Sequence, residues 1–180
     1  MAEWNLQYEI EEMFGEEVLE KVDLINIGGG IPSEYANTNT EVVEGVLEKI
    51  KNLRRWLNER NIQLMVEPGR YIAASSGKLA TKIISVYENN LVVDASVYNS
   101  DMDALIVPVK LLVEGELGKN DEGAKPYVIK GITPCSMDLF RYRVYLKNPK
   151  EGDEIVFLNA GAYNFATDFC DLKKINMEIK

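Results

Sequence analysis

The feature that most constrains this fold is an amphipathic helical pattern between two short apolar segments. Apolar residues recur at helical spacing over residues 42–57. The flanking segments, residues 22–27 and 62–66, are mostly apolar and typical of buried strands. Strand, helix and strand form a βαβ unit, which implies parallel pairing. Because two parallel strands cannot form a sheet covered on both faces, this part is predicted to be the end of a larger barrel or sheet.

Two further features frame this unit. Residues 9–21 are predicted to form a preceding helix that carries many glutamates on one side. Thr38, followed three residues later by Glu41, fits a capping box, so the central helix is expected to begin there.

The pattern changes near Ser75, and we divide the chain into residues 1–75 and 76–180. The second part is predicted to be mostly antiparallel β-structure, with Asn89 and Asn90 in a hairpin turn and residues 115–125 in an exposed loop. The expected strands are residues 81–87, 91–94, 104–112, 127–132 and 154–158.

Composition excludes several functions. The 180-residue chain has 20 basic and 29 acidic residues and no basic stripe, so nucleic acid is not an expected partner. It has no histidine, and Cys135 and Cys170 form no CxxC pair, so no metal site is expected. No apolar run reaches the roughly 20 residues that span a bilayer, and the amino terminus does not resemble a signal peptide. We therefore expect a cytoplasmic protein with no membrane partner.

Two polar segments follow the two predicted parallel strands. Gly28, Gly29 and Gly30 follow the first, where bare backbone can point N–H groups at an anion. Glu67 to Arg70 follow the second, so both segments should emerge at the same carboxyl edge, where α/β ligand sites lie. Arg70 can grip a phosphate there. Taken alone, the glycine triplet is better explained as a flexible strand-to-loop turn, and Glu67 to Arg70 could be a turn with a surface ion pair.

The motifs together resemble those of a known family. The segment Leu-Ile-Asn-Ile-Gly-Gly-Gly-Ile-Pro at residues 24–32, Glu-Pro-Gly-Arg-Tyr at 67–71 and Asn-Ala-Gly-Ala-Tyr at 159–163 are similar to three motifs of the fold-type III pyridoxal-phosphate (PLP) decarboxylases, in the family's order. This family includes the ornithine, diaminopimelate and arginine decarboxylases. The resemblance implies the carboxy-terminal end of a (β/α)8 barrel followed by a β domain.

The resemblance also implies roles for individual residues. Gly28, Gly29, Gly30 and Arg70 would bind the PLP phosphate, with Gly69 counted among the cofactor-binding residues. Glu67 would pair with the pyridinium nitrogen of the cofactor, which keeps the ring able to accept electrons. Tyr163 would add a hydroxyl hydrogen bond to the phosphate; alternatively, it is an ordinary half-buried tyrosine.

Residues 131–138 resemble the cysteine-bearing loop of the family, with a departure. Pro134 stands between Thr133 and Cys135, and the usual acidic neighbour is absent. A gapless match puts Cys135 where a substrate-binding acid is often found, whereas a one-residue shift makes it the catalytic thiol; a structural cysteine is equally plausible. Asp94 is similar to a family aspartate near the substrate, or is a strand-end turn residue. Cys170 matches no motif and is treated as structural.

None of the lysines has the setting of the family's cofactor-anchoring lysine, and the histidine that stacks on the ring is missing. The expected function is α-decarboxylation of a basic or dibasic amino acid, with this chain as a fragment or one half of a split enzyme. The resemblance implies a homodimer, or association with a missing amino-terminal half. The alternative is a non-catalytic relative that binds or regulates a partner.

Overall fold

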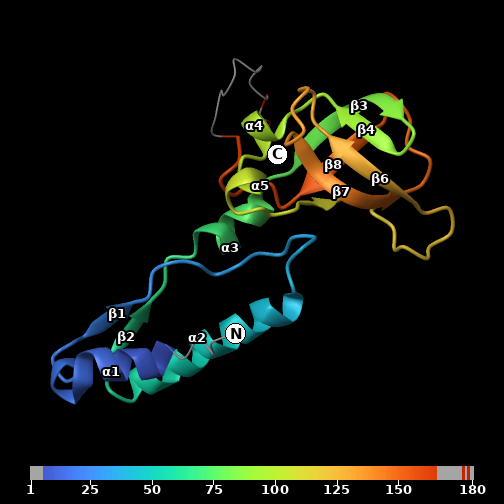
Figure 1. The fold of residues 1–180 in the computed structure, drawn as a ribbon. Coiled ribbons are helices and arrows are strands. Elements are labelled where there is room, and N and C mark those ends of the chain that lie inside the picture. Colours follow the sequence, from blue (N-terminus) through green and yellow to red (C-terminus); the bar gives the residue numbers. More distant parts are fainter. Residues whose placement is uncertain (1–5, 166–175, 177, 179–180) are drawn as a thin grey trace. The chain divides into compact units, whose positions relative to one another are not determined.

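A computed structural model describes residues 6–165, 176 and 178 of the chain. They form two compact units, which we call unit 1 (Met1–Ser33 and Thr38–Tyr71) and unit 2 (Glu34–Asn37 and Ile72–Lys180). Figure 1 shows the chain and labels most of its helices and strands. No helix among the described residues is both long and apolar enough to cross a membrane.

Unit 1 contains the predicted βαβ arrangement. Its elements are α1 (Leu6–Leu19), β1 (Leu24–Asn26), α2 (Thr40–Asn58) and β2 (Gln63–Met65), and α3 (Gly69–Ala73) begins at its end. Strands β1 and β2 are parallel, with Asn26 opposite Met65. The expected parallel pairing across a helix is therefore confirmed.

The helix cap differs from the prediction by one residue. Asn39 is the N-cap of α2, and its side chain accepts a hydrogen bond from the Glu41 backbone N–H at 2.9 Å. Thr38 instead donates its hydroxyl to the Ser33 carbonyl at 3.1 Å. Because Asn caps helices at least as well as Thr, the shorter Asn39–Glu41 contact takes the place of the expected capping box.

The core of unit 1 lies between the helices and one face of the small sheet. Strand residues Ile25 and Leu64 are partly buried against it, whereas Leu24 and Met65 on the opposite face are exposed. The Arg60 guanidinium lies 4.3 Å from the centre of the Trp56 ring. The buried residues of this core are Ile10, Leu19, Leu53, Trp56, Leu57 and Ile62.

Unit 2 is built around one mixed sheet. Its six strands lie in the order β5-β8-β3-β4-β6-β7, and all neighbours are antiparallel except β4 and β6. Phe140 and Phe157 stack in its core with ring centres 4.8 Å apart. The elements are the 3-10 turn η1 (Ala74–Ser76), β3 (Leu79–Tyr87), β4 (Asn90–Val93), α4 (Val97–Ser100), α5 (Asp103–Ile106), β5 (Leu112–Val113), β6 (Lys125–Lys130), β7 (Leu139–Leu146) and β8 (Glu154–Leu158).

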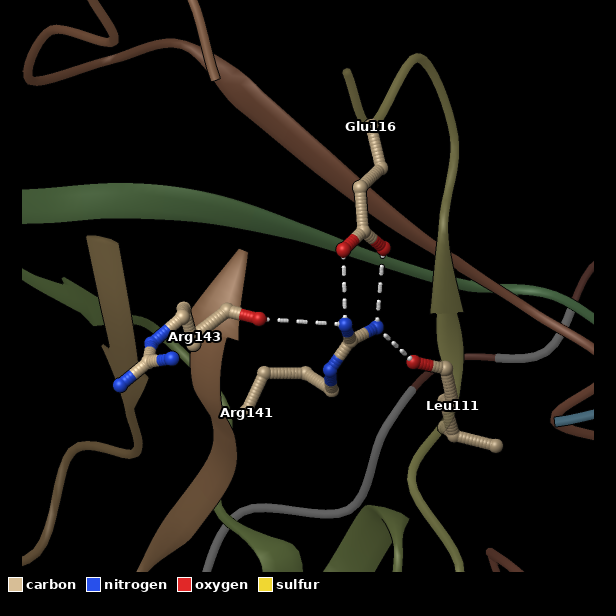
Figure 2. A network of polar contacts seen from close by, with 4 residues as sticks. All are labelled: Leu111, Glu116, Arg141 and Arg143. Atoms are coloured by element: carbon tan, nitrogen blue, oxygen red, sulfur yellow. Dashed lines mark hydrogen bonds and ion pairs between the residues drawn. The ribbon is translucent and has the colours of Figure 1, made fainter. Parts of the chain in front are cut away.

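The two end strands of this sheet approach each other. Leu117, just after β5, donates its N–H to the Tyr145 carbonyl in β7 at 2.8 Å. Arg141 of β7 is buried and binds both Glu116 oxygens at 2.8 and 3.0 Å and the Leu111 carbonyl at 2.6 Å (Figure 2). The sheet of unit 2 is thus a nearly closed barrel, with this charged contact across the remaining gap.

Several predicted strands of the second part agree with the structure. Strand β6 overlaps the predicted strand, and β8 has the predicted bounds. The β3–β4 hairpin turns at Glu88 and Asn89, one residue before the predicted turn, and Asn90 is the first residue of β4. The strand predicted over residues 104–112 is wrong. Hydrogen bonds to the Asp101, Met102 and Asp103 carbonyls form the short helix α5 there, and only Leu112 enters a strand. Strand β7 was not predicted.

Candidate functional site

The turns that follow β1 and β2 are joined. The Glu67 N–H donates to the Gly28 carbonyl at 2.7 Å, and the Ile27 N–H donates to the Met65 carbonyl at 3.1 Å. The expectation that the glycine triplet and Glu67 emerge at one carboxyl edge is therefore confirmed.

The three glycines are needed for different reasons. Gly28 and Gly30 have φ of +69° and +86°, a conformation that strains any other residue, and nothing lies within 4 Å of the position a Cβ would take. At Gly29 a Cβ would lie 2.8 Å from the Glu67 carbonyl oxygen. The turn is therefore a tight backbone loop with open space at two of its residues, which suits the approach of an anion.

Glu67 is exposed at this edge, and its side chain is held by Asn26. Its Oε1 accepts a hydrogen bond from the Asn26 amide at 2.5 Å. Among the described residues no hydrogen bond is assigned to Oε2. A carboxylate held in this way can receive a proton donor such as a protonated ring nitrogen.

Gly69 and Arg70 follow in the first turn of α3, where Arg70 is half-buried. Both belong to unit 1, with the glycine triplet and Glu67. A guanidinium in this unit adds the positive charge that a phosphate needs, since the other anion-binding groups are neutral N–H groups.

The cysteine-bearing loop of unit 2 is organised by Asp138. This carboxylate is buried and accepts hydrogen bonds from the Val97 N–H at 2.9 Å, the Thr133 N–H at 3.0 Å and the Thr133 hydroxyl at 2.7 Å. A Cβ at Gly131 would lie 2.1 Å from Asp138 Oδ1, so only glycine fits there. Asp138 was not among the site residues predicted from the sequence, where only the neighbouring Gly131 and Thr133 indicate a structured loop.

Cys135 lies exposed on this loop as a free thiol. The Tyr98 hydroxyl donates a hydrogen bond to its Sγ at 2.9 Å. This bond is the main cause of a lowered pKa of the Cys135 thiol, with backbone N–H groups of Met137 and Asp138 adding to it. An exposed thiol of lowered pKa is a more reactive nucleophile than an ordinary cysteine. Cys170 lies outside the described residues.

Asp94 lies at the end of β4 and is bound to its own hairpin. Its Oδ1 accepts from the Lys82 N–H at 2.8 Å, and its own N–H donates to the Lys82 carbonyl at 3.0 Å. The neighbouring Ala95 carbonyl accepts from the Ile132 N–H at 2.9 Å, which attaches this segment to the cysteine-bearing loop. Asp94 therefore has a structural role in the hairpin. Its second carboxylate oxygen, Oδ2, is available to bind a ligand.

Tyr163 is 63% exposed and ends the segment that follows β8. The Ala160 and Gly161 N–H groups donate to the Gly77 and Ala74 carbonyls at 2.9 and 3.0 Å. A Cβ at Gly161 would lie 2.2 Å from the Ala73 carbonyl oxygen, so this glycine is required by the close chain crossing. The contact between residues 160–161 and residues 73–77 fixes the position of the segment after β8, and the Tyr163 ring lies on the surface of unit 2.

Asp101 is a buried acid that the sequence analysis missed. It has no exposed surface, and neither carboxylate oxygen has a hydrogen-bond partner in the described part of the chain, although the Asn164 amide lies nearby. Burial raises the pKa of Asp101 to about 8; the Asp103 carboxylate adds to the rise and the Lys110 ammonium opposes it. Asp101 therefore carries its proton near neutral pH. Among all the residues that the structure describes, no group of three or more acidic or cysteine side chains is placed to hold a metal ion.

Comparison with known proteins gives these turns a context. Residues 8–74 match the family described as "Pyridoxal-dependent decarboxylase, pyridoxal binding domain". The diaminopimelate decarboxylase of Pseudomonas fluorescens is 30% identical over 144 residues, which cover 78% of this chain and 33% of that protein. Antizyme inhibitor 2 of Xenopus laevis is 27% identical over 184 residues, which cover 92% of this chain and 39% of that protein.

Solved structures show the same fold. The carboxynorspermidine decarboxylase of Campylobacter jejuni, complexed with norspermidine, aligns with a TM-score of 0.68 and 21% identity, covering 93% of this chain and 48% of that one. The lysine/ornithine decarboxylase of Vibrio vulnificus, complexed with putrescine, aligns with a TM-score of 0.69 and 22% identity, covering 94% and 49%.

The match over residues 8–74, which contain the glycine turn and Glu67, places the chain in the pyridoxal-phosphate-dependent class. The chain belongs to its fold-type III decarboxylases, and pyridoxal phosphate is the cofactor of that family. The chain spans 33% and 39% of the two curated relatives described above.

Proposed function

We propose that this chain supplies the phosphate- and ring-binding part of a PLP-dependent α-decarboxylase that acts on a basic or dibasic amino acid, of the ornithine, lysine, diaminopimelate or arginine class. The observation that most supports this proposal is the hydrogen bond between the turns that follow β1 and β2. It brings three glycines and Glu67 together at the carboxyl edge of the small sheet. In this proposal unit 1 is the end of a (β/α)8 barrel, unit 2 is the carboxy-terminal β domain, and the protein works in the cytoplasm.

The residues of unit 1 fit the cofactor. Gly28, Gly29 and Gly30 present backbone to its phosphate, and Gly69 and Arg70 complete the anion site. Glu67 holds the proton on the pyridine nitrogen. When bound, the cofactor supplies an electron-accepting ring for the electrons left when carbon dioxide departs.

The residues of unit 2 serve the phosphate and the substrate. Tyr163 adds its hydroxyl to the phosphate, and Asp94 binds the amino-acid substrate. The Cys135 thiol, activated by Tyr98, donates or accepts a proton at the substrate. In a homodimer the cysteine loop serves the site of the other copy.

The missing part of the barrel binds at a groove of unit 1. The groove has a volume of about 420 Å³ and lies between α1 and β1. Met13, Phe14, Val18 and Leu24 line it and are exposed. Strand β1 pairs with β2 alone among the described residues, so its other edge is open. An open edge beside an apolar groove favours addition of a parallel strand and its helix, and we propose that a neighbouring strand and helix of the barrel occupy it.

The second candidate is a non-catalytic relative that regulates a partner. The match to antizyme inhibitor 2, which covers 92% of this chain, favours it. The lack of any lysine in the setting of the family's anchoring lysine fits both candidates.

The test is to add PLP to the purified chain, with and without borohydride, alone and with the amino-terminal half of the Pseudomonas fluorescens relative. We expect weak, reversible binding to the chain alone and a borohydride-fixed cofactor only in the mixture, located by mass spectrometry on a lysine of the added half. No binding in either case would overturn the decarboxylase proposal and favour the regulatory relative.

A further inference from the structure

We propose that Asn26 is a positioning residue that holds the glycine turn and Glu67 in the arrangement needed for the two ends of the cofactor. This inference rests on the proposed function, because it concerns the same site. Asn26 is the last residue of β1, and its side chain lies on the exposed face of the small sheet.

Three hydrogen bonds form a closed ring around Asn26. The Gly28 N–H donates to Asn26 Oδ1 at 2.8 Å, and the Asn26 Nδ2 group donates to Glu67 Oε1 at 2.5 Å. The Glu67 N–H then donates to the Gly28 carbonyl at 2.7 Å, which closes the ring. One side chain thus connects the phosphate turn with the carboxylate for the ring nitrogen.

Only an amide of this length performs both functions. The Gly28 N–H can only donate and the Glu67 carboxylate can only accept, so the side chain between them must accept on one side and donate on the other. Aspartate in its ionised form would accept from Gly28 but could not donate to Glu67. The two fixed partners also settle which way the amide group points.

The ring orients the carboxylate of Glu67. Oε1 accepts from the Asn26 amide, which leaves Oε2 as the more open oxygen for the cofactor's ring nitrogen. Glu67 is exposed, and an exposed glutamate otherwise samples several rotamers. Asn26 therefore reduces the freedom of Glu67 before any ligand arrives, which is preorganisation.

The first measurement uses the full chain without ligand. Hydrogen exchange followed by NMR should show that Asn26→Ala speeds exchange of the Gly28 amide by roughly five- to tenfold, with a smaller increase at Glu67. Asn26→Asp should keep the Gly28 amide protected, since a carboxylate still accepts from it. Gln63→Ala is the matched control, because Gln63 is an exposed polar residue of the neighbouring strand β2. Unchanged exchange in Asn26→Ala would overturn the proposal.

The second measurement uses PLP labelled with ¹⁵N in the ring. In the wild-type chain the ring nitrogen should remain protonated to higher pH than in Asn26→Ala. In a Glu67→Gln background, Asn26→Ala should have no further effect on this titration, since Asn26 acts through Glu67. An equal effect in both backgrounds would contradict the proposal. Failure of the wild-type chain to bind PLP would instead count against the proposed function, whatever the exchange data show.

Discussion

The two units of this chain differ in how completely they enclose their own cores. Unit 2 closes a six-stranded sheet around 20 buried apolar residues, whereas unit 1 covers a two-stranded sheet with a core of six, counted over the described residues. Unit 1 also leaves an apolar groove and an open strand edge beside α1.

The unit with the larger core and the unit with the glycine turn are therefore different units. Unit 2 has a nearly closed sheet, in which the segment after the short end strand β5 approaches the outer edge of β7. Unit 1 contains the glycine turn and Glu67, yet its small core supplies little stabilisation of its own. The glycine turn and Glu67, to which we assign the phosphate and the ring nitrogen of the cofactor, therefore lie in the unit that has the smaller core and an open strand edge.

Asp101 gives the largest expected effect on the free energy of unfolding, and it tests whether a buried acid makes unit 2 less stable at higher pH. Its pKa of about 8 means that the folded chain keeps a proton that the unfolded chain releases near the ordinary aspartate pKa of 3.8. The free energy of unfolding should therefore fall as pH rises between about 4 and 8, by up to about 1.4 kcal/mol per pH unit from this group. Urea unfolding at several pH values should show that Asp101→Asn removes this slope.

The matched control for this prediction is Asp23→Asn, which changes an exposed carboxyl of unit 1. Its pH dependence should equal that of the wild type. Identical slopes for wild type and Asp101→Asn would show that Asp101 ionises normally in the folded chain.

Cavities test the difference between the two cores. Phe157 and Leu57 are each fully buried, one in unit 2 and one in unit 1. Phe157→Ala should cost about 3–5 kcal/mol of unfolding free energy and Leu57→Ala about 2–3 kcal/mol, because a small open core can relax around a cavity. Urea unfolding followed by the NMR methyl signals of each unit measures both. A larger loss for Leu57→Ala would reverse the comparison.

The next largest effect on the free energy of unfolding is expected at the charged contact between Arg141 and Glu116. Arg141→Met leaves the Glu116 carboxylate and the Leu111 carbonyl without their guanidinium, and should cost about 2–4 kcal/mol. Arg143→Met is the control, since the Arg143 side chain is exposed and points away from this contact (Figure 2). If both variants unfold at the same urea concentration, the contact does not stabilise the closed sheet.

The groove gives the smallest effect on stability. Phe14 is 46% exposed, so Phe14→Ser should change the unfolding free energy by less than about 0.5 kcal/mol. The same change should weaken association with a lysine-bearing amino-terminal half at least about tenfold. Val42→Ser, at an exposed position of α2 outside the groove, should leave this affinity unchanged. Calorimetric titration that shows equal affinities for the two variants would remove the groove as the binding surface.

The sequence predicted the parts of the fold that local pattern determines. The βαβ unit and strand β8 follow directly from apolar periodicity. Strand β7 was missed because Arg141 and Arg143 interrupt its apolar alternation, and the partner that permits burial of Arg141 comes from a distant segment. The strand predicted over residues 104–112 failed because the carbonyls of residues 101–103 close helical turns there.

The candidate site was predicted to a similar extent. Glycines that follow strands are visible in a sequence, and so is the shared edge of parallel strands. The roles of Asn26 and Asp138 are not visible, because each depends on contacts between residues 41 apart in the chain.

The measurement that tests the central claim most directly compares the binding of PLP and of pyridoxal, which lacks the phosphate, to wild type and to Gly29→Ala. The wild-type chain should bind PLP more tightly than pyridoxal in equilibrium dialysis. Gly29→Ala should lose this preference, because its Cβ would meet the Glu67 carbonyl at 2.8 Å, while Gly45→Ala in α2, with open space at its Cβ, should keep it. Equal binding of PLP and pyridoxal to wild type, or an unchanged preference in Gly29→Ala, would contradict the account.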